Sequence, residues 1–158
     1  MRFSAGVESP RMYERTFFIT AVCHERKPVF RSPTLAELLL DTMFTYRMQR
    51  KFLLHEFVIM PDHAHLILTP DIKIPMERAV QFIKGGFSYR CGKEANFSGE
   101  IWQPRSPDHR IRDDLDYEHH REYIHMNPVR AGLVAKAAEY PYSSANMRFK
   151  MDALPHQR

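Results

Sequence analysis

The stretch FVIMPDHAHLIL, residues 57–68, contains two apolar runs separated by a proline and an aspartate. Runs rich in β-branched and aromatic residues favour strands, and a Pro-Asp pair favours a turn. We therefore expect strands over 52–60 and 64–69 that pair as an antiparallel hairpin. Because side chains alternate along a strand, His63 and His65 should project from the same face of the sheet.

Apolar periodicity and helix-terminal residues predict the elements on both sides of this hairpin. Before the hairpin, we expect a strand over 16–22 and a helix that starts at a Thr34–Glu37 capping box. After it, we expect a helix from Pro75 that Gly85-Gly86 interrupts and an irregular strand over 101–112. The last predicted element is a helix from Asp113 to Asn127, which stops before Pro128. The order is that of a ferredoxin-like α+β sandwich, with a β-α-β-β-α-β core and an antiparallel sheet. The additional C-terminal helix carries Tyr123.

The composition indicates one folded domain. The 158 residues are 44% hydrophobic and 12% aromatic, which excludes a disordered chain. The net charge of +4 is compatible with a polyanionic partner but does not require one. We expect a flexible N-terminal tail at 1–12, a single catalytic domain at 13–146 and a C-terminal tail at 147–158.

Cysteine usage and hydropathy predict a cytoplasmic protein. The two cysteines lack CxxC spacing and are too few for a disulfide framework, so we expect both to be reduced. No run approaches the roughly 20 apolar residues that span a bilayer, and the N-terminus has no apolar segment suited to a signal peptide. We expect no membrane partner.

The residues around the hairpin and the last helix suggest a metal site beside a nucleophile. His63 and His65 offer two parallel ligands on a rigid strand, although half-buried strand histidines often only form hydrogen bonds. Asp62 either orients one imidazole or is an ordinary turn residue. Tyr123 and Asn127 are four residues apart and share a helix face. This combination favours attack of a tyrosine oxygen on a metal-polarised phosphodiester.

The surroundings of Tyr123 weaken its default role as a packing residue. His119 and His120 lie one turn before it, so its stripe of the helix is polar. The amide oxygen of Asn127 is a suitable third ligand for a hard divalent ion, while a helix stop before Pro128 is the alternative. Both interpretations stay open on local features.

Basic residues are candidates for phosphate contacts, because arginine forks match phosphate oxygens and glycines let a backbone approach closely. Taken singly, each basic residue is better explained as solvated surface charge. The candidates are Lys84, Gly85, Arg90, Arg105, Arg110, Arg112 and Arg130.

Two long motifs together point to a known family. They are MPDHAH at residues 60–65 and YIHMNPVRAGLV at 123–134, with KGGFS, IWQ, HRIRD and YPYSS segments in matching order. Over roughly residues 13–146 the chain resembles the Y1 single-tyrosine transposases of the IS200 type. It is most similar to their REP-associated branch.

The resemblance implies a role for each matched residue. His63 and His65 would be the histidines of the HUH motif, Tyr123 the nucleophile, and Asn127 the third ligand where mobile relatives carry glutamine. It also implies Mg²⁺ or Mn²⁺ and cleavage of single-stranded DNA next to a hairpin through a 5′-phosphotyrosine. Residues 105–109 depart from the aromatic-rich segment common in relatives, which puts DNA contacts from that loop in doubt.

Several alternatives remain open from sequence. A non-catalytic hairpin-binding protein derived from a transposase would not need His63, His65 and Tyr123 together, and a small-molecule hydrolase would leave no protein-linked product. The sequence allows a monomer or a homodimer, with Tyr123 serving its own histidines or those of a partner. When bound to DNA, the protein is expected in the nucleoid.

Overall fold

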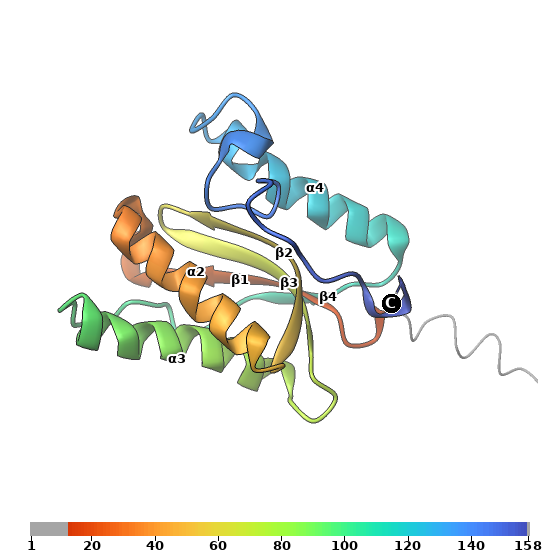
Figure 1. Cartoon of the computed structure of the whole chain (residues 1–158), viewed down its shortest axis with the longest axis horizontal. Helices are drawn as coiled ribbons and strands as arrows, with labels where there is room; N and C mark the ends of the chain where they lie inside the picture. The colour runs from red at the N-terminus through yellow and green to blue at the C-terminus, as the bar shows by residue number, and fades with distance from the viewer. Residues whose placement is uncertain (1–12, 158) are drawn as a thin grey trace, which may run out of the picture.

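A computed structural model describes residues 13–157, so the tail expected at 1–12 lies outside the described residues. The predicted series of elements is confirmed (Figure 1). In chain order the strands and α-helices are β1 (Phe17–Val22), α2 (Pro33–Met48), β2 (Phe52–Met60), β3 (His63–Pro70), α3 (Met76–Glu94), β4 (Asp108–Arg110) and α4 (Asp114–Arg130).

The strands form one antiparallel sheet in the order β2-β3-β1-β4. This is the strand order of a ferredoxin-like fold, and it places β3 between β2 and β1. His65 is consequently opposite Thr20 of β1 on one side and Val58 of β2 on the other. The two expected metal ligands thus lie on a central strand with paired backbone on both sides.

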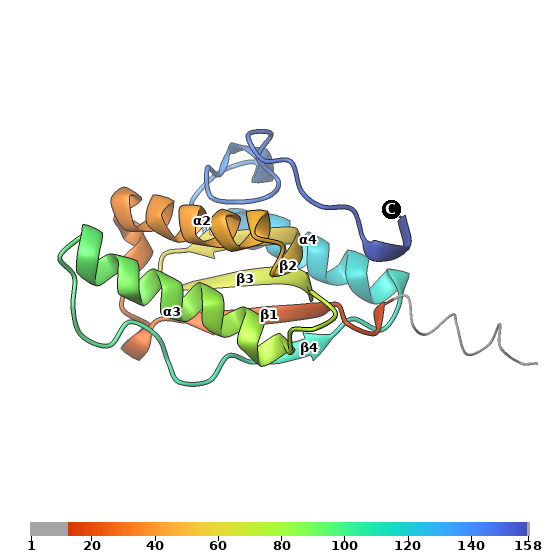
Figure 2. The same cartoon turned by 60° about the horizontal axis from the view of Figure 1, so that its bottom comes forward.

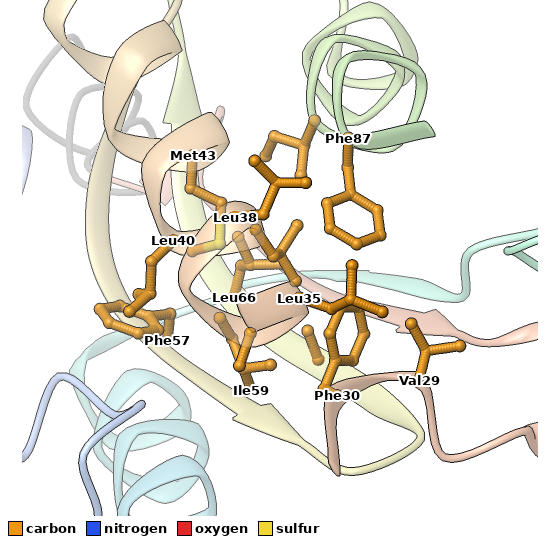
Figure 3. Close-up of a cluster of buried hydrophobic side chains, with 14 of the residues drawn as sticks. Val29, Phe30, Leu35, Leu38, Leu40, Met43, Phe57, Ile59, Leu66 and Phe87 are labelled. Atoms are coloured by element: carbon orange, nitrogen blue, oxygen red, sulfur yellow. The ribbon is translucent and has the colours of Figure 1, made fainter. Parts of the chain in front are cut away.

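The two faces of the sheet carry different helices. Helices α2 and α3 cover one face, and α4 crosses the other (Figures 1 and 2). The α2/α3 side holds the larger apolar cluster, in which Leu39, Phe57, Leu66 and Phe87 are almost fully buried. Figure 3 shows side chains of α2, α3 and the strands interlocking in this core. Ala64 and Leu66 face this side, so their neighbours His63 and His65 face α4, as the alternation predicts.

The predicted break in the second helix is wrong, because α3 is continuous from Met76 to Glu94. Gly86 allows close contact between helices instead of ending one: a Cβ there would lie 2.7 Å from a ring carbon of Tyr46 on α2. The predicted N-cap of α2 is also wrong. Ser32, not Thr34, is the N-cap, and its hydroxyl accepts the Leu35 N–H.

The last strand and last helix differ from prediction in length. Only 108–110 form a strand, because Pro104 and Pro107 have no N–H to donate; the preceding segment meets β1 through isolated bonds, such as Gln103 N–H to Val22 O. Helix α4 runs through Pro128 to Arg130. The proline removes one hydrogen bond, but the Ala131 N–H still reaches Asn127 O.

The C-terminal residues pack against the domain. Asp152 accepts hydrogen bonds from the Arg47 guanidinium and from the Leu54 N–H, and Leu154 is buried. Asp152 and Leu154, in the segment expected as a tail, therefore pack against the described domain. Within residues 13–157, no helix is long and apolar enough to cross a membrane.

Candidate active site

The paired histidines lie at the start of β3, directly after the 61–62 turn. Their ring centroids are 4.8 Å apart, which confirms the predicted common face. The Nδ1 of His63 is 2.7 Å from Asp62 Oδ1, and the Arg26 guanidinium is 3.2 Å from Asp62 Oδ2. Burial alone would raise the pKa of Asp62, but these two hydrogen bonds outweigh it and lower the pKa. An ionised Asp62 fixes the proton of His63 on Nδ1 and leaves Nε2 available as a ligand.

His65 is more deeply buried than its neighbour, with 5% of its surface exposed. Burial, with smaller contributions from His63, Arg26 and His120, lowers its pKa to about 3, so the ring is neutral at pH 7. Nδ1 lies 3.0 Å from the Thr20 hydroxyl, and Nε2 is buried without a hydrogen-bond partner among residues 13–157. In the tautomer that donates from Nδ1 to Thr20, the neutral ring keeps an unpaired Nε2, which is the chemistry of a metal ligand.

Tyr123 lies beside these histidines on α4. Its ring centroid is 5.3 Å from that of His65 and 6.2 Å from that of Phe18, and 45% of its surface is exposed. The Arg130 guanidinium lies 5.2 Å from the ring centroid and also donates to the Tyr123 carbonyl. The phenol is therefore held between aromatic and cationic neighbours at the surface, next to the histidines of its own chain.

Asn127 follows Tyr123 by one helical turn and is half-buried. Its carbonyl accepts the Ala131 N–H, whereas its side-chain amide makes no hydrogen bond within the described residues. The amide is thus not required by the local fold. Its role as a ligand stays a prediction.

The two histidines predicted near Tyr123 behave differently. His120 contacts Phe18, at 4.6 Å between centroids, and Phe18 stacks on His65 at 5.1 Å. His120 also stacks on His109, and both rings approach the buried carboxylate of Asp116. His119 is exposed on α4. Only His120 is linked to the histidine pair through contacts that the structure records.

The predicted basic contacts lie on both sides of the sheet. On α3, the buried Lys84 ammonium donates to Gln103 O and Ser106 Oγ, and burial lowers its pKa. Arg90 forms ion pairs with Asp41 and Glu94. Lys84, Gly85 and Arg90 therefore belong to the layer away from the histidines, whereas Arg105, Arg110, Arg112 and Arg130 are exposed beyond β1 or on α4.

A buried carboxylate on β2 holds the tyrosine helix in place. Glu56 is 9% exposed and sits next to a register shift in the β2–β3 pairing. His125 Nε2 lies 2.6 Å from one of its oxygens, and Ser144 Oγ donates to the same oxygen at 2.7 Å. Tyr117 and Arg121 approach the other oxygen. Burial would raise the pKa of Glu56, but the hydrogen bonds from His125 and Ser144 lower it.

Sequence reasoning missed four residues that build this site: Phe18, Thr20, Arg26 and Glu56. Thr20 lies within the predicted strand over 16–22, but the β1–β3 register that places it opposite His65 is known only from the structure. Arg26 and Glu56 contact partners far along the chain, and no local pattern marks them.

An antiparallel ferredoxin-like sheet with paired histidines beneath a helix-borne tyrosine defines the class of single-tyrosine, or HUH, transposases. The chain belongs to the IS200-like transposase family, whose model matches residues 12–127. That range includes His63, His65, Tyr123 and Asn127.

Individual relatives fall in one branch of the family. The chain is 32% identical to the REP-associated tyrosine transposase of Escherichia coli (strain K12), over 82% of this chain and 75% of the relative. It is 33% identical to a protein of Haemophilus influenzae named as a REP-associated tyrosine transposase, over 61% of each chain. A solved REP-associated tyrosine transposase bound to a REP hairpin superposes with a TM-score of 0.70 at 32% identity, covering 82% of this chain and 75% of that one.

Proposed function

We propose that this protein cleaves and rejoins single-stranded DNA next to hairpins, with Tyr123 as the nucleophile and a divalent cation, Mg²⁺ or Mn²⁺, as cofactor. One observation carries the proposal: the Tyr123 ring lies 5.3 Å from His65, whose buried Nε2 has no hydrogen-bond partner in the described part of the chain. A nucleophile and an unsatisfied ligand atom thus share one small surface.

His63, His65 and Asn127 would hold the cation. The buried, unpaired Nε2 of His65 fits this role, and the Asn127 amide, which makes no hydrogen bond to another of residues 13–157, offers an oxygen ligand. When bound, the cation polarises the target phosphate and offsets charge in the transition state. Two imidazoles also tolerate Zn²⁺ or Cu²⁺, so the choice of Mg²⁺ or Mn²⁺ rests on the family.

The step exchanges one phosphoester for another. The phenolic oxygen of Tyr123 forms a bond to phosphorus while the bond between phosphorus and the 3′ oxygen of the DNA breaks. The phenol proton passes to water. The departing 3′ oxygen takes a proton from water. The product is a 5′-phosphotyrosine and a free 3′-hydroxyl. Because the ester bond is conserved, a 3′-hydroxyl can reverse the step without ATP, which separates strand transfer from hydrolysis.

Single-stranded substrate suits an exposed site. An unpaired strand can bend its backbone toward Tyr123, whereas duplex DNA would first have to be unstacked at a cost of a few kcal/mol per step. The relative solved with a REP hairpin supports a hairpin as the partner. The position of Tyr123 against the histidines of its own chain supports action by a monomer.

The test uses labelled single strands of the hairpin repeats that flank the gene, incubated with the protein and Mn²⁺ and resolved on a denaturing gel. We expect a shifted band of DNA-linked protein. Tyr123→Phe should abolish that band and leave DNA affinity nearly unchanged, because only the nucleophilic oxygen is lost. Tyr89→Phe is the matched control, since Tyr89 is exposed on α3 in the layer away from the histidines.

Other results would identify the alternatives. Hairpin binding without a DNA-linked band on any repeat would indicate a non-catalytic binding protein, and cleavage without the band would indicate a hydrolase. Mixing Tyr123→Phe protein with His63→Ala/His65→Ala protein distinguishes a monomer from a dimer in which Tyr123 serves the partner's histidines. A monomer acting in cis predicts no recovery of activity, whereas a dimer that exchanges α4 predicts recovery.

A further inference from the structure

The turn between β1 and the 29–31 segment lies directly against the histidine-bearing hairpin. The Cys23 N–H donates to Asp62 O, and the Phe30 N–H donates to Pro61 O. On its other side, the His24 N–H donates to Ile101 O. Hydrogen bonds on both sides therefore fix this turn in place.

The turn has an unusual backbone. Glu25 and Arg26, neither of them glycine, have φ values of 54° and 53°. Consecutive left-handed residues with a Cβ are disfavoured and persist only where the surroundings enforce them. Among residues 13–157, the Glu25 side chain makes only loose ion pairs, with His24 at 3.8 Å and with Lys27 at 3.9 Å. Arg26 is the residue that the strained turn directs toward the site.

The Arg26 guanidinium is only partly used by the protein. Nη1 lies 3.2 Å from Asp62 Oδ2, while 62% of the side chain is exposed. Nε and Nη2 have no hydrogen-bond partner within residues 13–157. Asp62 holds His63 with its other oxygen. Arg26 thus presents free donors at the rim of the histidine pair, and a planar guanidinium fork matches a phosphate group.

The contacts also place Arg26 relative to the nucleophile. They run from Tyr123 to His65, to His63, to Asp62 and finally to Arg26. Tyrosine attack on phosphorus expels the 3′ oxygen on the side opposite the phenol. With the phosphate held at the histidine pair, which separates Arg26 from Tyr123 along these contacts, the strand that ends in the new 3′-hydroxyl would leave toward Arg26.

We propose that Arg26 binds the DNA phosphate next to the cleaved bond on the 3′-hydroxyl side, and so holds the departing strand in the site. This inference rests on the proposed function of Tyr123. The simpler alternative is that Arg26 only keeps Asp62 in position beneath His63. The two differ in whether the effect of Arg26 depends on the charge of that phosphate.

The first experiment measures the rate of the DNA-linked band with the mapped repeat oligonucleotide. Arg26→Gln should slow it about 10- to 100-fold. Lys27→Gln, which removes the same charge from the adjacent exposed residue, should change it less than about threefold. A methylphosphonate, which is uncharged, is then placed at the predicted phosphate. With this modified DNA, the wild type should form the DNA-linked band at the rate that Arg26→Gln shows with unmodified DNA. The modification should not slow Arg26→Gln any further.

A binding measurement on proteins that also carry Tyr123→Phe separates this inference from the proposed function. Arg26→Gln should weaken affinity for the hairpin oligonucleotide about three- to tenfold and flatten its salt dependence by roughly one phosphate contact, while Lys27→Gln should do neither. Arg26→Gly, whose glycine suits the positive φ, should keep or raise the melting temperature and still show the loss of affinity.

The outcomes differ for the two proposals. If the wild type forms no DNA-linked band, the proposed function fails. The binding measurement still tests whether Arg26 contacts a DNA phosphate. Equal behaviour of Arg26→Gln and Lys27→Gln in both assays would overturn the role of Arg26. So would a methylphosphonate that slows the wild type and Arg26→Gln by the same factor, since that result assigns Arg26 to holding Asp62 alone.

Discussion

The two faces of the sheet are built by different means. On the α2/α3 side the buried residues are almost all aliphatic or aromatic, and three aromatic rings, of Phe30, Phe87 and Trp102, pack against one another. The apolar cluster on the α4 side is smaller. There the buried groups include two carboxylates, Glu56 and Asp116, each contacted by histidines.

This difference explains how one small domain can combine stability with an exposed site. Apolar packing is strong but non-directional, so it stabilises the fold without fixing a side chain to within a fraction of an ångström. Hydrogen bonds to a buried carboxylate are directional and set the rotation of a helix. We infer that the α2/α3 face supplies most of the stability and that Glu56 sets the position of Tyr123.

The largest loss of stability should come from the apolar face. Phe87→Ala removes a fully buried ring and should lower the free energy of unfolding by about 3–5 kcal/mol. Chemical denaturation measures this loss. Below the unfolding transition, the variant should form the DNA-linked product at nearly the wild-type rate. A severe loss of activity in the folded variant would show that the two faces are not separable.

Glu56→Gln should lower activity as well as stability, unlike Phe87→Ala. The amide of glutamine has the shape of the carboxylate, but its N–H groups would face at least one hydrogen-bond donor. The donors around Glu56 are on His125, Ser144, Tyr117 and Arg121. The variant should therefore lose about 2–4 kcal/mol of stability. The rate of DNA-linked product should fall at least tenfold in folded protein, because α4 is no longer fixed. Ser144→Ala, which removes one donor and keeps the carboxylate, is the control and should lose about 1 kcal/mol. Activity equal to that of Phe87→Ala would contradict the positioning role.

The same contrast explains what could be predicted from the sequence. The hairpin, the shared face of His63 and His65 and the order of elements follow from local alternation and turn residues, which act over a few positions. Arg26 contacts Asp62 across 36 residues, and His125 contacts Glu56 across 69. Such contacts depend on the path of the whole chain. The inner face of α4 mixes the apolar residues Tyr117, Ile124 and Pro128 with buried Asp116, so no continuous apolar stripe reveals what it packs against.

The error at Gly85-Gly86 has a related cause. Two adjacent glycines weaken an isolated helix, so local propensity predicts a break. In the folded protein the close approach of Tyr46 to Gly86 requires a residue without a side chain. Gly86 therefore serves a contact between α2 and α3, and the two glycines do not end the helix.

The two glycines give a matched pair on the stable face. Gly86→Ala would place a Cβ 2.7 Å from the Tyr46 ring, which must then move, so we expect a loss of about 1–3 kcal/mol. At Gly85 the nearest atom, also at 2.7 Å, is the end of the flexible Gln81 side chain. Gly85→Ala should therefore gain about 0.5–1 kcal/mol from helix propensity. Thermal unfolding of both variants tests this, and equal shifts would reject the packing explanation.

The smallest effect concerns a carboxylate that ties the C-terminal segment to α2 and β2, away from the histidines. Burial would raise the pKa of Asp152, but hydrogen bonds from Arg47 and the Leu54 N–H lower it. Because the folded-state pKa is depressed, this group stabilises the protein above its unfolded-state pKa of about 3.9 and loses that effect as pH falls through the folded-state pKa. Asp152→Asn should therefore cost about 1–2 kcal/mol at pH 7, and wild type and variant should converge in acid.

The control is a second carboxylate–arginine pair between the same two segments. Glu37 and Arg148 are 3.3 Å apart, and both side chains are more than 40% exposed. Solvent screens such a pair, so Glu37→Gln should change stability by less than about 0.5 kcal/mol. Urea unfolding at a series of pH values compares the variants. If Asp152→Asn and Glu37→Gln gave the same curve, burial of Asp152 would have no energetic consequence, and directional carboxylate contacts would count only on the face that carries Tyr123.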